Sequence, residues 1–103
     1  MKTIQDQVQT FVTTHGLETN AETRFLDLVS EVGELGKELL KSTDYGTITF
    51  TPTENLSNEL GDILFSLTCL ANTLNIDLTT TLNATLKKYE TRLFQGGTPS
   101  SSI

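Results

Sequence analysis

The chain is short of the residues that build disulfides and soft-metal sites. It has one cysteine, one histidine and no tryptophan in 103 residues. A single Cys69 excludes an internal disulfide bond and a cysteine-based zinc cluster, and a single His15 excludes a histidine-rich metal site. No apolar run approaches the roughly 18–20 residues of a membrane-spanning helix, and no apolar signal core follows Met1. We therefore expect a cytoplasmic protein in a reducing compartment, with no membrane partner.

Positive charge is scarce as well. Seven Lys and Arg residues accompany thirteen Asp and Glu residues, which gives a formal net charge of -6. Binding to a nucleic-acid polymer normally requires clustered Lys and Arg, so this balance argues against such a partner and fits a protein that collects cations. The apolar fraction is 36%, below the roughly 45–50% of a typical globular domain. In a single small domain, this shortage predicts that a partner subunit completes the core.

Apolar residues recur at helical spacing in four segments, which predicts an all-α, four-helix fold. The expected helices run from about Thr3 to His15, Asn20 to Lys41, Thr51 to Leu74, and Asp77 to residue 94. Between the second and third helices, Tyr45-Gly46 marks a turn and residues 47–51 are expected to form a short extended piece. The domain is assigned to residues 1–94. Residues 95–103, with two glycines, a proline and three serines, are expected to be a disordered tail.

Two short segments share the order acidic, aliphatic, glycine, acidic: Glu31-Val32-Gly33-Glu34 and Glu59-Leu60-Gly61-Asp62. At about 100° per residue, both pairs of acids flank their apolar stripes on the same rotational side. If the two helices pack antiparallel, the four carboxylates converge on one face, and Glu38 can join them. Such crowding is costly unless cations or protons neutralise it. An all-oxygen set suits a hard cation, Mg²⁺ first and Mn²⁺ as a possible substitute.

The two motif glycines strengthen this interpretation. Glycine inside a helix costs about 1 kcal/mol relative to alanine, so Gly33 and Gly61 at equivalent positions predict a close backbone approach beside the site. The competing interpretation is a solvated acidic face, which normally pairs each acid with a lysine four residues on. Here Glu31 and Glu59 are followed at that distance by Leu35 and Ile63. The spacing therefore favours a metal site.

The segments from Leu28 to Leu35 and from Asn58 to Leu64 resemble the signature of MazG-type nucleoside triphosphate pyrophosphohydrolases, which belong to the all-α NTP pyrophosphatase superfamily. The resemblance covers roughly Asn20 to Phe94. It implies hydrolysis of an NTP or dNTP to the nucleoside monophosphate and pyrophosphate, with Mg²⁺ held by acidic ligands. The implied metal ligands are Glu31, Glu34, Glu59 and Asp62, with Glu34 and Glu31 as the catalytic pair and Glu34 orienting the water. Many members have a further acid where this chain has Ser30; members related to dCTP pyrophosphatase also lack it.

Helix four offers a basic complement to these acids. Lys88 and Arg92 are spaced i, i+4 and are candidates to bind the outer phosphates, with solvated or interhelical ion pairs as an equally supported alternative. Arg24 is expected to act as an ion-pair partner. Phe65 lies opposite the main stripe of its helix and needs a second apolar surface, which predicts a homodimer or tetramer. Two other functions stay open, a phosphoribosyl-ATP pyrophosphatase and a non-catalytic helical interaction module.

Overall fold

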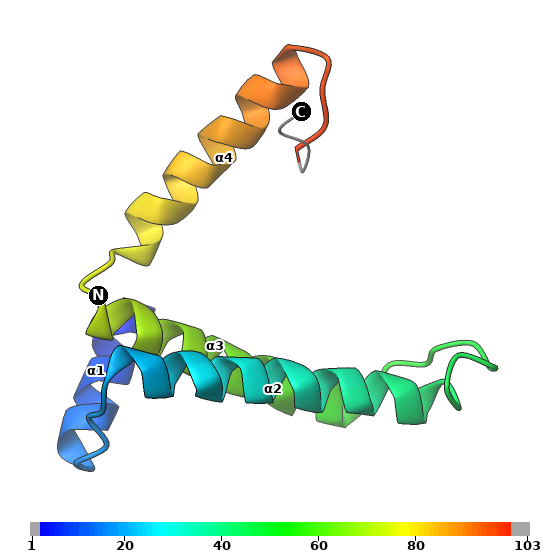
Figure 1. Cartoon of the computed structure of the whole chain (residues 1–103), viewed down its shortest axis with the longest axis horizontal. Helices are drawn as coiled ribbons and strands as arrows, with labels where there is room; N and C mark the ends of the chain where they lie inside the picture. The colour runs from blue at the N-terminus through cyan, green and yellow to red at the C-terminus, as the bar shows by residue number, and fades with distance from the viewer. Residues whose placement is uncertain (1–2, 100–103) are drawn as a thin grey trace.

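The computed structural model describes residues 3–99, and all regular secondary structure in that range is helical. Four helices follow one another along the chain, α1 (Ile4–Thr14), α2 (Ala21–Ser42), α3 (Glu54–Thr73) and α4 (Leu78–Phe94) (Figure 1). The predicted all-α class and the four helices are confirmed. The extended piece expected at residues 47–51 forms no strand; hydrogen-bonded turns begin this connection, with the Tyr45 N–H donating to the Leu40 carbonyl at 2.7 Å.

The helices begin where the sequence supplies capping side chains. Thr3, Asn20 and Asp77 precede α1, α2 and α4, and each side-chain oxygen accepts a backbone N–H three residues further on, at 2.8–3.1 Å. These bonds satisfy donors that the first helical turn leaves free. Gly16, with φ of 64°, lies just beyond the end of α1, where a left-handed residue is needed to turn the chain and glycine adopts it without strain.

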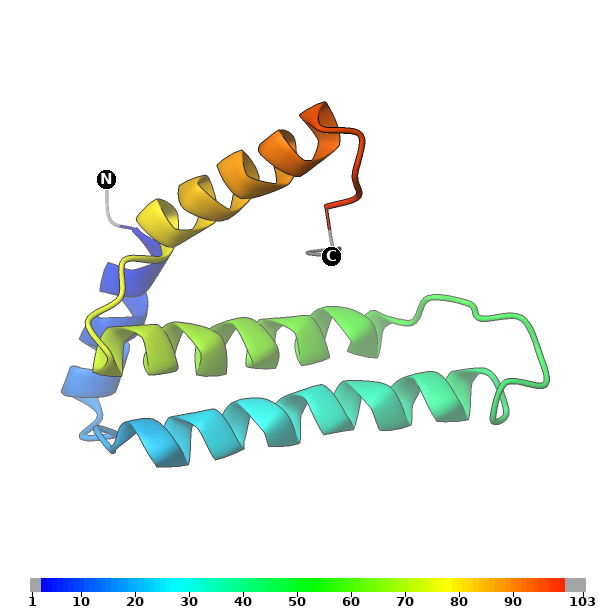
Figure 2. The ribbon, with the colours of Figure 1, turned by 45° about the horizontal axis from the view of Figure 1, so that its top comes forward.

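Helices α2 and α3 form an antiparallel pair along most of their length, and α1 packs across α3 at one end of the pair (Figure 2). The α3 surface that they cover is made of small residues, since Ser66, Thr68, Cys69 and Ala71 are all buried. The hydroxyl of Thr68, which is fully buried, donates to the Leu64 carbonyl at 2.7 Å. Each buried hydroxyl of this kind needs such a partner to offset its lost hydration.

Helix α1 also packs against the aromatic residue of α3, Phe65. The Phe65 ring meets the Phe11 ring edge to face, with centroids 6.0 Å apart, a favourable arrangement for two aromatic rings. Part of the second apolar surface that the sequence demands for Phe65 is therefore supplied within the chain, although Phe11 itself stays 49% exposed. The dimer stays a prediction, and the remaining exposed apolar faces also support it.

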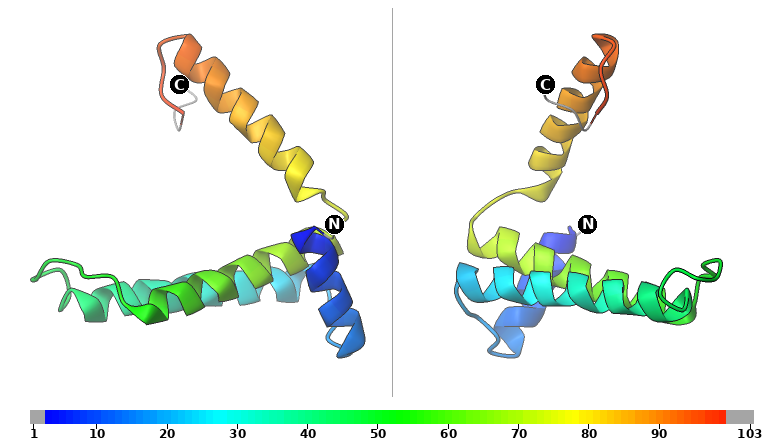
Figure 3. Two further views of the ribbon diagram at one scale, coloured as in Figure 1. Left: turned by 180° about the vertical axis from the view of Figure 1, so that it is seen from behind. Right: turned by 45° about the vertical axis from the view of Figure 1, so that its right-hand side comes forward.

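Exposed apolar faces remain on several helices, among them α4, which leaves the three-helix unit at an angle and packs closely against none of the other described helices (Figures 1 and 3). Its stripe residues Leu82, Leu86 and Leu93 are each more than half exposed. Beyond α4, the Gly97 N–H donates to the Arg92 carbonyl at 2.9 Å, so the chain turns back at once. The disorder expected from residue 95 stays a prediction; residues 100–103 lie outside the described part of the chain.

Candidate metal centre

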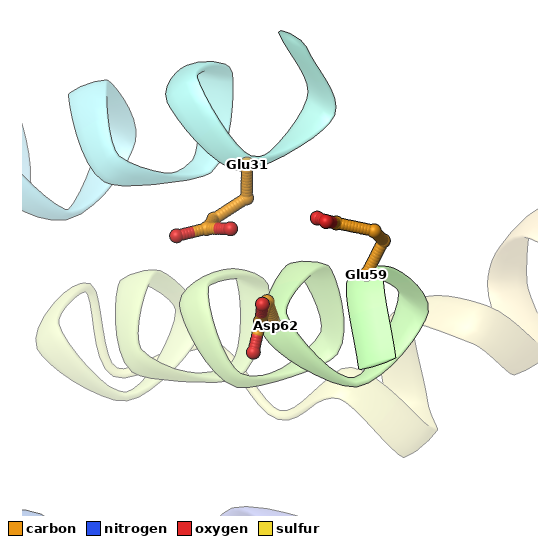
Figure 4. A group of neighbouring side chains, drawn as sticks. All are labelled: Glu31, Glu59 and Asp62. Carbon is orange, nitrogen blue, oxygen red and sulfur yellow. The ribbon is translucent and has the colours of Figure 1, made fainter. Parts of the chain in front are cut away.

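Three carboxylates gather between the two long helices. Glu31 extends from α2 toward α3, where Glu59 and Asp62 lie one turn apart (Figure 4). One oxygen from each of the three lies within 4.8 Å of the others. The antiparallel pairing of α2 and α3 produces this arrangement, because it turns the acidic edges of both helices to the same side. The group is open on that side, with Glu31 and Glu59 partly buried and Asp62 exposed.

The other two predicted acids lie at the edge of this group. Glu34, one turn after Glu31, is exposed and contributes no oxygen to the close trio, although its charge acts on Glu31. Glu38 lies another turn along α2 and accepts a 3.3 Å hydrogen bond from the hydroxyl of Thr53, the residue before α3. The structure therefore brings together three of the four proposed ligands, leaves Glu34 beside them and gives Glu38 a structural bond.

The electrostatics of the cluster favour neutralisation. Partial burial, and then the negative charges of Asp62, Glu59, Glu34 and Asp27, raise the pKa of Glu31 above its ordinary value of 4.5. Within residues 3–99, no lysine or arginine forms an ion pair with the three carboxylates. The hydrogen bond that the trio does receive is a long one, 3.4 Å from the Asn55 amide to Glu59. Carboxylates arranged in this way can take up a proton or hold a hard cation through oxygen ligands.

Asn55, which is not among the predicted site residues, lies beside the acidic cluster. It lies four residues before Glu59 on the same helix, a spacing that puts two side chains on one face. The i, i+4 spacing to Glu59 is thus the feature of the sequence that indicates Asn55 as part of the site.

The predicted close approach of the α2 and α3 backbones at the two motif glycines is not observed. A Cβ placed on Gly33 or on Gly61 would meet nothing within 4 Å. The expected close approach of α2 and α3 backbones at these glycines is therefore wrong for the single chain. The tight packing lies further along α3, where the buried residues are small but not glycine. Nothing in the described chain explains the choice of glycine at these two positions.

In the single chain, the basic residues of α4 do not lie beside the acidic cluster. Lys88 and Arg92 lie over the ring of Tyr89, at 5.4 and 5.9 Å from its centroid, and Arg92 also donates to the Pro99 carbonyl at 2.7 Å. Because α4 diverges from the α2–α3 pair, neither cation is brought to the acids. Their binding of phosphate stays a prediction.

Arg24 lies on α2 and is almost completely buried, with 8% of its surface exposed. Its guanidinium is 3.9 Å from the Asp27 carboxylate, which confirms the expected ion pair, and it donates to the Leu17 carbonyl at 2.6 Å. The second bond joins α2 to the loop that follows α1.

None of the helices within residues 3–99 combines the length and the apolar composition of a membrane-spanning segment.

Comparison with known proteins gives one family. Residues 19–94 match the MazG nucleotide pyrophosphohydrolase domain. The YpjD protein of Bacillus subtilis (strain 168) is 38% identical over 68 residues, which make up 63% of this chain and 60% of YpjD. The Gene 37 protein of Mycobacterium phage L5 is 35% identical over 74 residues, 69% of this chain and 64% of the phage protein. The matched segments thus span less than two thirds of either relative.

The fold comparison agrees with the sequence matches. The crystal structure of YpjD from Bacillus subtilis, a candidate pyrophosphatase, superposes with a TM-score of 0.71 at 30% identity. The superposition covers 89% of this chain and 97% of the YpjD chain. The matched region includes both acidic segments, which lie within residues 19–94.

Proposed function

The chain belongs to the MazG nucleotide pyrophosphohydrolase family, and from this premise we propose that it hydrolyses a nucleoside or deoxynucleoside triphosphate to the monophosphate and pyrophosphate. The observation that carries the proposal is the trio of Glu31, Glu59 and Asp62, whose oxygens approach within 4.8 Å and form no ion pair with any lysine or arginine of residues 3–99. A non-catalytic interaction module has no need of such a costly arrangement.

The donor set fits Mg²⁺. All three groups are carboxylates, the ligands that hard divalent cations prefer, and they come from two helices whose packing holds them on one side. Glu31, Glu59 and Asp62 would hold the ion, and Glu34 lies one turn after Glu31 on α2, outside the close trio. When bound, Mg²⁺ supplies charge neutralisation for the phosphates and lowers the pKa of water.

The chain's own residues would then perform two tasks. The α2–α3 pair positions the carboxylates on a rigid surface, so that little reorganisation accompanies the reaction. Glu34, exposed and not part of the close trio, is free to accept a hydrogen bond from the attacking water and orient it toward the α-phosphorus. This division assigns holding to the trio and proton acceptance to Glu34.

The direct test is a panel of NTPs and dNTPs, together with phosphoribosyl-ATP, assayed for pyrophosphate release with Mg²⁺. We expect release from at least one triphosphate and none after chelation. Asp62→Asn should lower the rate by about 100-fold or more, the scale of losing a preorganised electrostatic group, and should remove the heat of Mg²⁺ binding in calorimetry. Glu90→Gln, at an exposed acid on α4, is the matched control and should keep both.

The products distinguish the remaining alternatives. Hydrolysis in ¹⁸O-labelled water should place the label in the nucleoside monophosphate. Label in free phosphate, with the diphosphate as co-product, would contradict attack at the α-phosphorus. Pyrophosphate release from phosphoribosyl-ATP alone would establish the biosynthetic substrate, and no release with no Mg²⁺ heat would leave the non-catalytic module.

A further inference from the structure

The chain reverses directly after α4, at a turn that two glycines specify (Figure 1). The Gly96 N–H donates to the Leu93 carbonyl at 3.0 Å, and the Gly97 N–H donates to the Arg92 carbonyl at 2.9 Å. These are the two bonds of the Schellman motif, which requires a left-handed residue after the C-cap, and Gly96 has φ of 81°. A Cβ on Gly97 would lie 3.2 Å from the Arg92 carbonyl oxygen. A side chain at either glycine would therefore disturb the turn.

The turn brings a backbone carbonyl to the side chain of Arg92. Nη1 of Arg92 donates to the Pro99 carbonyl at 2.7 Å. Arg92 and Pro99 are both partly buried, whereas the residues from 86 to 91 and from 93 to 98 are exposed. The ring of Tyr89 makes a second contact, with its centroid 5.9 Å from the guanidinium carbon. The guanidinium is thus held in place from within the end of α4 and the turn that follows it.

The bond to Pro99 leaves one edge of the Arg92 guanidinium open. A guanidinium carries five N–H donors in a planar fork, and it binds phosphate best through two parallel N–H bonds from one edge. Among residues 3–99, Nη1 is the only Arg92 nitrogen with a side-chain hydrogen bond. The edge formed by Nε and Nη2 keeps its two parallel donors. The Pro99 carbonyl therefore fixes the guanidinium without using the edge that suits a phosphate.

The charges around Arg92 favour an anion. Lys87, Lys88 and Arg92 are three of the seven Lys and Arg residues in the chain, and none of them forms an ion pair with an acid of residues 3–99. At about 100° per residue, Lys88 and Arg92 lie only about 40° apart around α4, while Glu90 lies about 160° from each. An anion that approaches Arg92 on this side meets two cations and avoids the Glu90 carboxylate.

We propose that the turn after α4 positions Arg92 to bind the pyrophosphate part of the substrate, with Gly96 and Gly97 as the positioning residues. The inference rests on the proposed function, which gives pyrophosphate as a product. Immobilising a long side chain normally weakens binding, and the turn immobilises Arg92 before a phosphate arrives. Because the turn and Arg92 belong to the same end of α4, they keep this arrangement however α4 meets the acids. Opening the turn should weaken pyrophosphate binding by about 3- to 10-fold, the scale of one freed side chain.

Calorimetry of inorganic pyrophosphate binding to the full chain with Mg²⁺ tests this positioning apart from hydrolysis. Gly96→Val puts a β-branched residue at a positive φ, which is strained, and Gly97→Val presses a side chain against the Arg92 carbonyl. Each should raise the Kd of pyrophosphate by about 3- to 10-fold. Gly46→Val is the matched control, since Gly46 also has a positive φ, 83°, but lies in the connection between α2 and α3. It should leave the Kd unchanged.

Two further measurements separate positioning of Arg92 from a general loss of structure. In an Arg92→Ala background, Gly96→Val should weaken pyrophosphate binding no further, because the turn acts through that side chain. In NMR spectra of the wild type, the Arg92 Nε–H should be resolved from the signal of a free arginine side chain. In Gly96→Val the two signals should coincide, while circular dichroism shows the helix content of the wild type.

Each contrary result overturns a definite step. An unchanged or lower Kd in both glycine variants contradicts the positioning, as does an equal weakening in the Arg92→Ala background. Pyrophosphate that binds equally to wild type and Arg92→Ala, or binds to neither, shows that Arg92 is no phosphate ligand. If triphosphates are hydrolysed while the Kd ignores the turn, the positioning fails and the proposed function stands. If the Kd responds to the turn as expected but no triphosphate is hydrolysed, the proposed function fails and the positioned arginine remains.

Discussion

Gln5 joins three helices through one side chain, and its removal should be costly. The amide nitrogen donates to the Asn72 side chain at 2.9 Å and to the Ile76 carbonyl at 2.8 Å, and the amide oxygen accepts from the Leu78 N–H at 2.7 Å. Gln5 thus ties α1 to the end of α3 and to the first residue of α4. Gln5→Ala removes all three bonds and leaves the carboxamide of Asn72 with one partner fewer.

The size of the effect follows from these bonds. A typical protein hydrogen bond contributes about 1 kcal/mol to the free energy of unfolding, so three give at most about 3 kcal/mol. Gln5 is only partly buried, and water can replace some of what is lost, so we expect a loss of about 2 kcal/mol. For a domain of 60–100 residues this lowers Tm by roughly 8–16 °C.

Urea and thermal unfolding followed by circular dichroism measure the change. Gln7→Ala is the matched control, because Gln7 is an exposed residue on the same helix whose side chain makes no hydrogen bond in the described chain, and it should change stability by no more than about 0.5 kcal/mol. A double-mutant cycle with Asn72→Ala should give a coupling of at least about 0.5 kcal/mol. If Gln5→Ala is no less stable than Gln7→Ala, the bridge does not hold the α3–α4 turn.

Three further predictions concern the acids, the cations and the assembly. Glu31→Gln should make the metal-free protein more stable than the wild type at pH 7, because the raised pKa of Glu31 means that folding disfavours its charge. That advantage should shrink as pH falls through the raised pKa and disappear below about 4.5; an advantage that grows on acidification contradicts the charge-crowding argument. Lys88→Ala and Arg92→Ala should each raise the inhibition constant of pyrophosphate by about 10-fold, and unchanged inhibition in both variants removes α4 from the phosphate site. Light scattering should give at least a dimer at micromolar concentration, whereas a mass of 11.3 kDa would show that the exposed faces of α4 are tolerated in a monomer.

Local signals in the sequence predict most of the fold. The caps at Thr3, Asn20 and Asp77 are short-range features, because each side chain bonds to the backbone three residues away, and the helices they begin are found where expected. The third helix lacks a side-chain cap bond at Thr53, and there the sequence narrows the start only to residues 51–53, the last of which is the observed N-cap. Boundaries are thus most accurate where a local hydrogen bond defines them.

Long-range features are harder to predict. The convergence of Glu31, Glu59 and Asp62 follows from periodicity and an antiparallel pairing, so the sequence predicts it. The bridge from Gln5 to Asn72 and the contact between Phe11 and Phe65 join residues more than fifty positions apart. A glutamine or a phenylalanine carries no periodic signal that identifies its distant partner. The sequence therefore predicts the acidic cluster, but not the contacts that join α1 to α3.

The direction of α4 decides how the basic residues can act. The α3–α4 turn contains Asn75 in the left-handed region, with φ of 56°, and Gln5 bonds to the two residues that flank Asp77. These constraints direct α4 away from the acids and leave its leucine stripe exposed. Lys88 and Arg92 can therefore meet phosphates over the trio only if this turn changes or if α4 packs against the acids of another subunit. The first route requires loss of the Gln5 bridge and predicts a Gln5→Ala variant with altered pyrophosphate inhibition. The second route requires assembly, and predicts that pyrophosphate inhibition weakens on dilution below the dimer dissociation constant.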